Sequence, residues 1–260
     1  KKLAENPNFI PGIYNYCDRW CERCPFTSRC MNFALSEEHF DDPETHDIKN
    51  KAFWQKLSEM FQLTREMLEE TAADWGIDLD SLDLQAAQDE LETRRQEAES
   101  HECARAAKAY AQTVKNWFDS AKDLFEQKED ELNTEARLEL PGSDPAAEAT
   151  QLSDAVEVIR WYQHFIYAKL LRAIKGALEE TDEPPDEYPK DSDGSAKVAL
   201  IAMDRSIAAW GQMNKHFHEH ESDILNILVH LDRLRRKTEK SFPDARAFVR
   251  PGFDDANQDI

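Results

Sequence analysis

Glycine is scarce in this sequence, with 7 residues among 260, and runs of β-branched residues are few. A sheet protein would need Gly-rich turns and β-branched strands, so both shortages argue against strands. Alanine, leucine, glutamate, lysine, glutamine and arginine dominate long stretches instead, and these are good helix formers. We therefore expect an all-α protein.

Long apolar runs are also missing. The most hydrophobic stretch, residues 156–171, is interrupted by Glu157, Arg160, His164 and Lys169. A membrane-spanning helix needs about 20 mostly apolar residues in succession, so we expect no membrane association.

Positive charge is in short supply. Lysine and arginine total 32 against 53 acidic residues, which gives a formal net charge of −21. A field of that sign repels phosphate backbones, and we therefore expect no nucleic-acid partner.

Three well-known catalytic motifs are absent: a Gly-rich phosphate loop, a G-x-S-x-G nucleophile turn and an H-E-x-x-H zinc motif. The Glu-x-x-His repeats of ferritin-like di-iron centres are absent too. The sequence therefore names no reaction.

Three regions can be told apart along the chain. Residues 1–50 hold four of the five cysteines and several helix breakers; residues 51–240 carry helical periodicity; residues 241–260 form an irregular tail that we expect to dock on the helices. We expect four long helices, at about 47–75, 80–133, 145–180 and 195–240. The third is apolar nearly all round and should be central. Four long helices with alternating connections predict an antiparallel bundle.

The cysteines give the strongest signal. Cys17, Cys21, Cys24 and Cys30 follow the spacing C-x3-C-x2-C-x5-C. On a helix the first three would share one face, and Pro25 would end that helix so that Cys30 could return as a fourth ligand. Such a concentration of thiols predicts a metal site.

Three interpretations compete for these cysteines. Disulfides suit short secreted chains rather than a chain of this size, and cysteines on one helical face would pair with awkward geometry. A structural zinc site usually draws its thiolates from two C-x2-C turns, and here only Cys21 and Cys24 form one. On a helix, Cys17 and Cys24 would also lie about 10.5 Å apart along the axis, which is far for one ion.

An iron–sulfur cluster of the [4Fe-4S] type collects thiolates from more widely spread positions, and Cys24-Pro25 has the form seen in ferredoxin-type ligand runs. We therefore place the cluster ahead of zinc and expect a redox or sensing protein with an unknown protein as redox partner. The alternative is a noncatalytic interaction protein in which zinc staples the N-terminal segment. The placement of the cysteines favours the cytoplasm.

Histidines suggest a second, weaker hypothesis. His216 and His220 are four residues apart on the fourth expected helix, and His164 lies on the third. With Glu157 or Glu219 they could form a metal site inside the bundle, which would make the protein a metalloenzyme. The alternative is that they are ordinary hydrogen-bonded histidines at the core boundary. Cys103 stands apart and is most simply a small helical residue.

Overall fold

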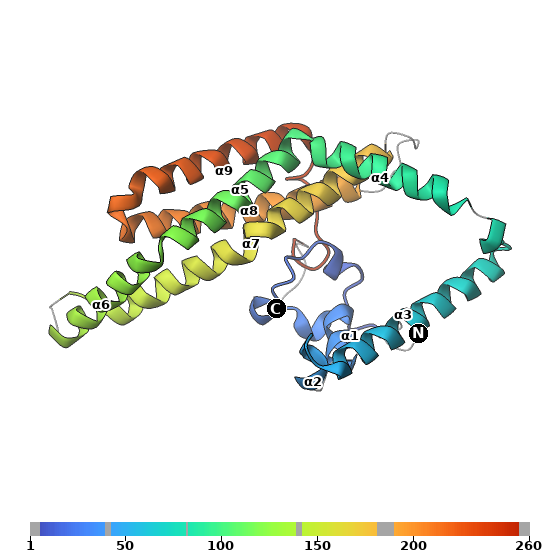
Figure 1. Ribbon diagram of the computed structural model, residues 1–260, viewed down its shortest axis with the longest axis horizontal. Coiled ribbons are helices and arrows are strands. Elements are labelled where there is room, and N and C mark those ends of the chain that lie inside the picture. Colours follow the sequence, from blue (N-terminus) through green and yellow to red (C-terminus); the bar gives the residue numbers. More distant parts are fainter. Residues whose placement is uncertain (1–5, 40–42, 82, 139–141, 181–189, 255–260) are drawn as a thin grey trace. The chain divides into compact units, whose positions relative to one another are not determined.

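The structure is a computed structural model that describes residues 6–39, 43–81, 83–138, 142–180 and 190–254. Its elements are all helical in these ranges, as expected for an all-α protein. The longer helices are α3 (Lys51–Asp74), α4 (Leu84–Ser100), α5 (Glu102–Ser120), α6 (Lys122–Leu138), α7 (Pro145–Glu180), α8 (Asp191–His216) and α9 (Glu221–Ser241) (Figure 1). The shorter ones are α1 (Met31–His39), α2 (Pro43–His46) and the 3₁₀ turns η1 (Ile13–Asn15), η2 (Cys21–Arg23), η3 (Thr27–Arg29), η4 (Leu79–Ser81) and η5 (His218–His220).

The chain divides into two compact units. The first, which we call the cysteine unit, comprises residues 1–92 together with residues 250–260; the second, the bundle unit, comprises residues 93–249. The division falls inside α4 and just after α9, whereas the sequence had suggested boundaries near residues 50 and 240. Within the described ranges, neither unit contains a helix long and apolar enough to cross a membrane.

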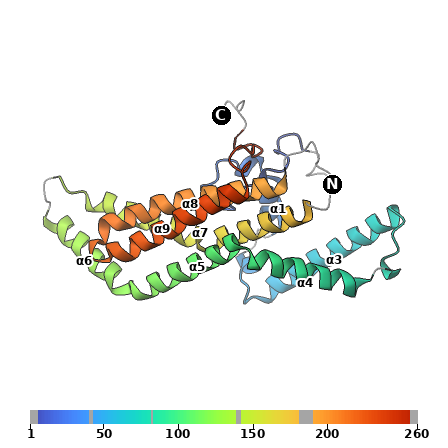
Figure 2. The same ribbon diagram turned by 90° about the horizontal axis from the view of Figure 1, so that it is seen from above.

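In the bundle unit, α7 and α8 pack side by side along their length (Figures 1 and 2). Arg172 near the end of α7 pairs with Asp191 at the start of α8, at 2.6 Å. Glu148 near the start of α7 lies 3.0 Å from His216 at the end of α8. Contacts at both ends of the pair fix the two helices as antiparallel.

Helices α5 and α9 complete the bundle. Gln163 of α7 donates to the Ala111 carbonyl of α5 at 2.8 Å. His230 of α9 lies 2.8 Å from the Ala106 carbonyl of α5, and Lys237 of α9 pairs with Glu102 at 2.6 Å. Each of α7 and α9 therefore packs between α5 and α8, and these four helices form an antiparallel bundle. Its members differ from the expected four, because α3, the first expected helix, belongs to the cysteine unit and the fourth expected helix supplies both α8 and α9.

Tyr110 and Trp210 lie at the centre of this bundle. Both side chains are almost fully buried, and the Trp210 indole N–H donates to the Tyr110 hydroxyl at 3.2 Å. Burial raises the pKa of Tyr110 to about 12, because the interior disfavours the phenolate, although the hydrogen bond from Trp210 lowers the pKa in part. Trp117 packs edge-on to Trp210 with ring centroids 5.1 Å apart. The polar atoms of these large rings are thus partly satisfied inside an apolar core.

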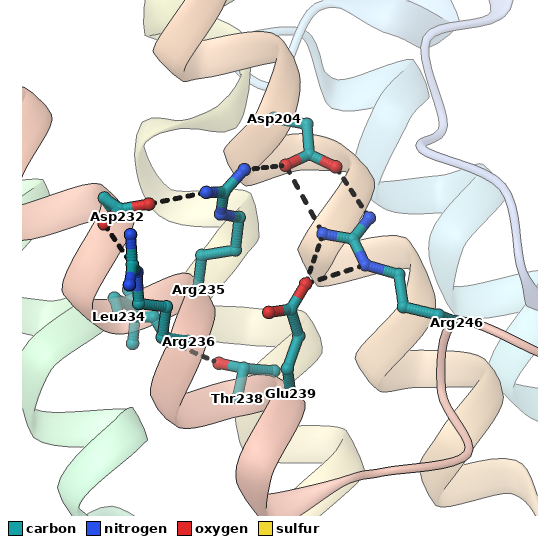
Figure 3. Close-up of polar contacts among 8 residues, drawn as sticks. All are labelled: Asp204, Asp232, Leu234, Arg235, Arg236, Thr238, Glu239 and Arg246. Atoms are coloured by element: carbon teal, nitrogen blue, oxygen red, sulfur yellow. Dashed lines mark hydrogen bonds and ion pairs between the residues drawn. The ribbon is translucent and has the colours of Figure 1, made fainter.

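An ion-pair network joins α8, α9 and the chain that follows α9 (Figure 3). Asp204 of α8 accepts from Arg235 of α9 at 3.3 Å and from Arg246 at 2.6 Å. Arg246 also reaches Glu239 of α9 at 2.8 Å. Because Arg246 belongs to the segment after α9, the network holds that segment against the bundle, where Ala245 and Phe248 are buried.

Two of the long helices expected from the sequence are in fact broken. The second comprises α4, α5 and α6, and His101 caps the start of α5 by accepting from the Cys103 N–H at 3.2 Å. The fourth comprises α8, η5 and α9 and breaks at Phe217, which has no helical backbone although no glycine or proline is near. Phe217 is buried and its ring lies 5.2 Å from the Phe125 ring. The break lets α9 turn back and pack antiparallel to α8, with Arg235 beside Asp204.

Replacing Trp210 by alanine should lower the unfolding free energy by about 3–5 kcal/mol, because a fully buried ring leaves a cavity and removes the Tyr110 bond. Trp161→Ala on α7 is the matched control, since 36% of that side chain is exposed. Denaturant unfolding followed by circular dichroism measures both. Equal losses in the two variants would contradict the central position of Trp210.

Candidate cysteine centre

The backbone around the four cysteines forms three separate turns and not the expected helix. Cys21 begins η2, and the Cys24 N–H closes this turn on the Cys21 carbonyl at 3.1 Å. Cys30 follows η3 and donates in the same way to the Thr27 carbonyl at 3.2 Å. The prediction that the first three cysteines share one helical face is therefore wrong. Two local features account for this: Arg19 has a positive φ of 60°, which interrupts a helix between Cys17 and Cys21, and Cys24 is extended at φ −88° and ψ 123°, as the following Pro25 favours.

The backbone changes direction at Arg19, between Cys17 and Cys21. Arg19 has a φ of +60°, and within the described ranges it is the one non-glycine residue with a positive value. Such a conformation costs a side-chain-bearing residue about 1–2 kcal/mol. The neighbouring Asp18 carboxylate accepts from the Trp20 N–H at 3.2 Å and supports the turn.

All four cysteines line one small cavity of about 20 Å³, which is room for roughly one water molecule. Their side chains are half-buried. The other lining residues are mostly apolar or aromatic and come from the same unit: Ile13, Tyr14, Asp18, Arg19, Trp20, Thr27, Phe33 and Phe253. The structure thus brings the four predicted site residues to one cavity, but through turns of the backbone and not through the helix that the spacing predicted.

The thiols influence one another electrostatically. Burial raises the pKa of Cys21, and negative charge on Cys17, Cys24 and Cys30 would raise it further. Burial likewise raises the pKa of Cys24. Without a cation these thiols therefore resist ionisation, and a bound metal would supply the positive charge that favours the thiolates.

Within the described ranges, no group of three or more His, Cys, Asp or Glu side chains has an arrangement that would hold a metal ion. The four cysteines share a cavity, but their role as metal ligands stays a prediction.

The C-terminal segment contributes to this centre, which sequence reasoning missed. Phe253 lines the cavity and packs edge-on to Phe26 with ring centroids 5.1 Å apart. Gly252 has a φ of +77° and lies so close to Ile10 and Ile13 that an added Cβ would stand 2.9 Å from both side chains. The expected docking of the tail on the bundle therefore holds for Ala245 and Phe248, whereas Gly252 and Phe253 pack in the cysteine unit. In the sequence, this packing was indicated by Pro251-Gly252, a pair that breaks helices, directly before the aromatic Phe253.

The residues of the predicted histidine metal site, unlike the four cysteines, do not all line one cavity. His216 lies 3.0 Å from Glu148, which also pairs with Lys128 at 2.8 Å. His220 lines a cavity of about 350 Å³ together with His216 and Glu219, and its nearest carboxylate is Asp223 at 3.8 Å.

His164 does not reach this place. It is exposed on α7, about 24 Å along the helix axis from Glu148 at 1.5 Å per residue. Glu157 lines a different groove, between α6 and α7. The structure therefore brings His216, His220 and Glu219 to one cavity and leaves His164 and Glu157 outside it. Cys103 is buried beside Ser241 in the bundle unit.

Comparisons with protein-family models, with curated proteins and with solved structures found no match to this chain.

Gly252→Ala should loosen the cysteine unit, because the new methyl group would press on Ile10 and Ile13. The Ile10 amide donates to the Arg29 carbonyl at 3.0 Å and reports on this packing. We expect its hydrogen exchange to speed up by about tenfold or more. Gly76→Ala is the matched control, since Gly76 has a similar φ of +68° but no atom within 4 Å of the added Cβ. The same change in both variants would contradict a packing role for Gly252.

Glu148→Gln should lower the unfolding free energy at pH 7 by about 1 kcal/mol, a value reduced for the partial exposure of this carboxylate. Lys128 and then His216 hold the pKa of Glu148 below its usual 4.5. Its stabilising effect is therefore present above pH 4.5 and is lost as the pH falls through the lowered pKa. Unfolding measured at several pH values should show wild type and variant converging in acid. Glu126→Gln, an exposed change on α6, should have little effect at any pH.

Proposed function

We propose that this protein binds a [4Fe-4S] iron–sulfur cluster through Cys17, Cys21, Cys24 and Cys30 and serves in electron transfer or sensing. The observation that carries the proposal is the shared cavity: the thiols of Cys21 and Cys24 at η2, of Cys30 after η3 and of Cys17 in the preceding loop line one space. Its present volume of about 20 Å³ would have to widen to hold a cluster. Cysteine thiolates are the usual ligands of such clusters.

The surroundings of the cavity support a cluster. Tyr14, Trp20, Phe33 and Phe253 line it, and an apolar shell limits solvent access and tunes the reduction potential. Arg23 stacks on the Trp20 ring at 4.0 Å, which keeps a positive charge beside a group whose four thiolates would make it anionic.

The small core of the cysteine unit also supports a bound metal group. In the described part of this unit, only Ile10, Ile13, Ala72 and Gly252 are buried. A unit that buries so little surface gains little stability from the hydrophobic effect. Metal binding would supply folding free energy at the place where the turns converge.

Zinc is the second candidate, and one observation favours it. The turn from Cys21 to Cys24, closed by the Cys24 N–H, has the C-x2-C form that zinc sites use. Because the segment is not helical, the long axial separation of Cys17 and Cys24 no longer argues against a single ion. In that case zinc would staple the cysteine unit and the protein would act by interaction with a partner.

The bundle unit then has a supporting role in the proposal. An unknown protein would exchange electrons with the cluster. Reduced thiols and an oxygen-sensitive cluster suit the cytoplasm, which is the compartment we propose.

Metal analysis and a visible absorption spectrum on protein purified without oxygen test this proposal. We expect iron and acid-labile sulfide in about equal amounts, near four of each per chain, with a broad absorption band toward the blue end. Each single Cys→Ser change at the four positions should lower the iron content severalfold. Cys103→Ser is the matched control, because this buried cysteine of the bundle unit should leave the iron unchanged.

Other outcomes would decide against the cluster. Zinc without colour would identify the structural zinc site, and chelation should then speed up hydrogen exchange in residues 8–30. Protein that contains neither metal under anaerobic conditions would overturn both candidates.

A further inference from the structure

The wall of the cysteine cavity comes from two distant parts of the sequence. All but one of its lining residues lie between Ile13 and Phe33. The exception is Phe253, which follows α9 near the other end of the sequence. Within the cysteine unit, Phe253 is therefore held at the cavity by noncovalent contacts alone. It is the part of the wall that can leave without a change in the turns that carry the cysteines.

A compact turn presents the Phe253 ring to the cavity. The N–H groups of Phe253 and Asp254 both donate to the Arg250 carbonyl at 3.1 Å. The Arg250 guanidinium donates to both carboxylate oxygens of Asp254, at 3.1 and 2.9 Å, and lies over the Phe253 ring at 4.8 Å. The two charged side chains are only 15% and 23% exposed, so salt screens their attraction little. Residues 250–254 thus hold their own shape and fix the direction of the ring.

Contacts with the cysteine-bearing segment keep this turn closed. The Phe253 ring packs edge-on to Phe26 with centroids 5.1 Å apart, and Gly252 lies close to the side chains of Ile10 and Ile13. Phe26 is in turn bonded to a thiol: burial raises the pKa of Cys24, and a hydrogen bond from the Phe26 backbone lowers it in part. Ring and methyl contacts are weak individually, so the turn can open while the rest of the unit stays folded.

The segment before the turn is anchored in the bundle unit. Phe248 is buried, and its carbonyl accepts from Lys197 of α8 at 2.5 Å. Arg246 pairs with Asp204 of α8 at 2.6 Å. Val249, between the two anchored stretches, is 56% exposed. An opened turn would therefore stay tethered, because movement is confined to the few residues after Phe248.

We propose that residues 250–254 form a lid over the four cysteine thiols and that Phe253 closes it. The closed cavity of about 20 Å³ has room for roughly one water molecule, so a larger group can enter only when part of the wall moves. Phe253 is that part, because the other lining residues belong to the segment that carries the cysteines. Control of metal entry and release by the lid rests on the proposed function, whereas shielding of the thiols does not.

Alkylation of the thiols tests the lid without any metal. The full chain, reduced and treated with a chelator, is exposed to iodoacetamide, and peptide mass spectrometry follows the four cysteines of the cavity separately from Cys103. Phe253→Ala should speed their alkylation by about fivefold or more, because the ring no longer covers them or holds the turn on Phe26. Phe253→Leu keeps an apolar side chain and should restore most of the protection. Val249→Ala is the matched control, since this exposed residue precedes the turn, and it should leave the rate unchanged.

Hydrogen exchange of the Ile10 amide separates a lid from general loosening of the unit. In Phe253→Ala this amide should exchange at close to the wild-type rate, because Gly252 still packs on Ile10 and Ile13. Alkylation and Ile10 exchange that rise by the same factor would overturn the proposal. An alkylation rate that Phe253→Ala leaves unchanged would overturn it as well.

Metal release tests the role of the lid toward the proposed ligand. A chelator should remove iron or zinc severalfold faster from Phe253→Ala than from the wild type. Equal release rates would overturn control of the metal by the lid. Protein that contains neither metal would overturn the proposed function, while the alkylation rates would still decide whether the lid exists.

Discussion

The bundle unit depends on the antiparallel packing of α7 against α8. Polar contacts tie the pair at both ends, through Arg172 with Asp191 and Glu148 with His216. Between these ends, buried residues of both helices meet along the interface, while α5 packs on α7, α9 packs on α8, and α5 and α9 pack on each other. Once this pair is set, Trp210 of α8 points to Tyr110 of α5, and Asp204 of α8 meets Arg235 of α9. The polar contacts thus select one register for helices whose association the apolar surfaces drive.

The cysteine unit is held together on a different principle. It has few buried side chains and uses tight turns, close backbone approach and half-buried aromatic rings instead. Gly252 and Phe253 come from the far end of the sequence, so this unit is built from two distant segments of the chain. A metal group at the shared cavity would add stability where the core is thin.

Helix content, the central position of α7 and the grouping of the four cysteines were all predictable from residue type and spacing. The break at Phe217 was not, because no helix-breaking residue stands there; it belongs to the turn by which α9 packs back on α8, a tertiary contact. The histidine hypothesis failed to gather its members for a related reason. The prediction that His216 and His220 share a face of one helix is wrong, because α8 ends at His216 and His220 lies in η5. Spacing also gives no information on which turn of α7 His216 meets. That turn contains Glu148 and not His164.

The sequence by itself determined that this chain is helical, that α7 is apolar on several sides and that Cys17, Cys21, Cys24 and Cys30 fall within one short segment. These are local properties, set by helix propensity, periodicity and chain proximity. Only the tertiary structure decided that the cysteine segment forms turns and that Phe253 joins it. It also decided that Glu148 meets His216. Such contacts join residues far apart in sequence, and their free energies depend on shape and burial that no local pattern records.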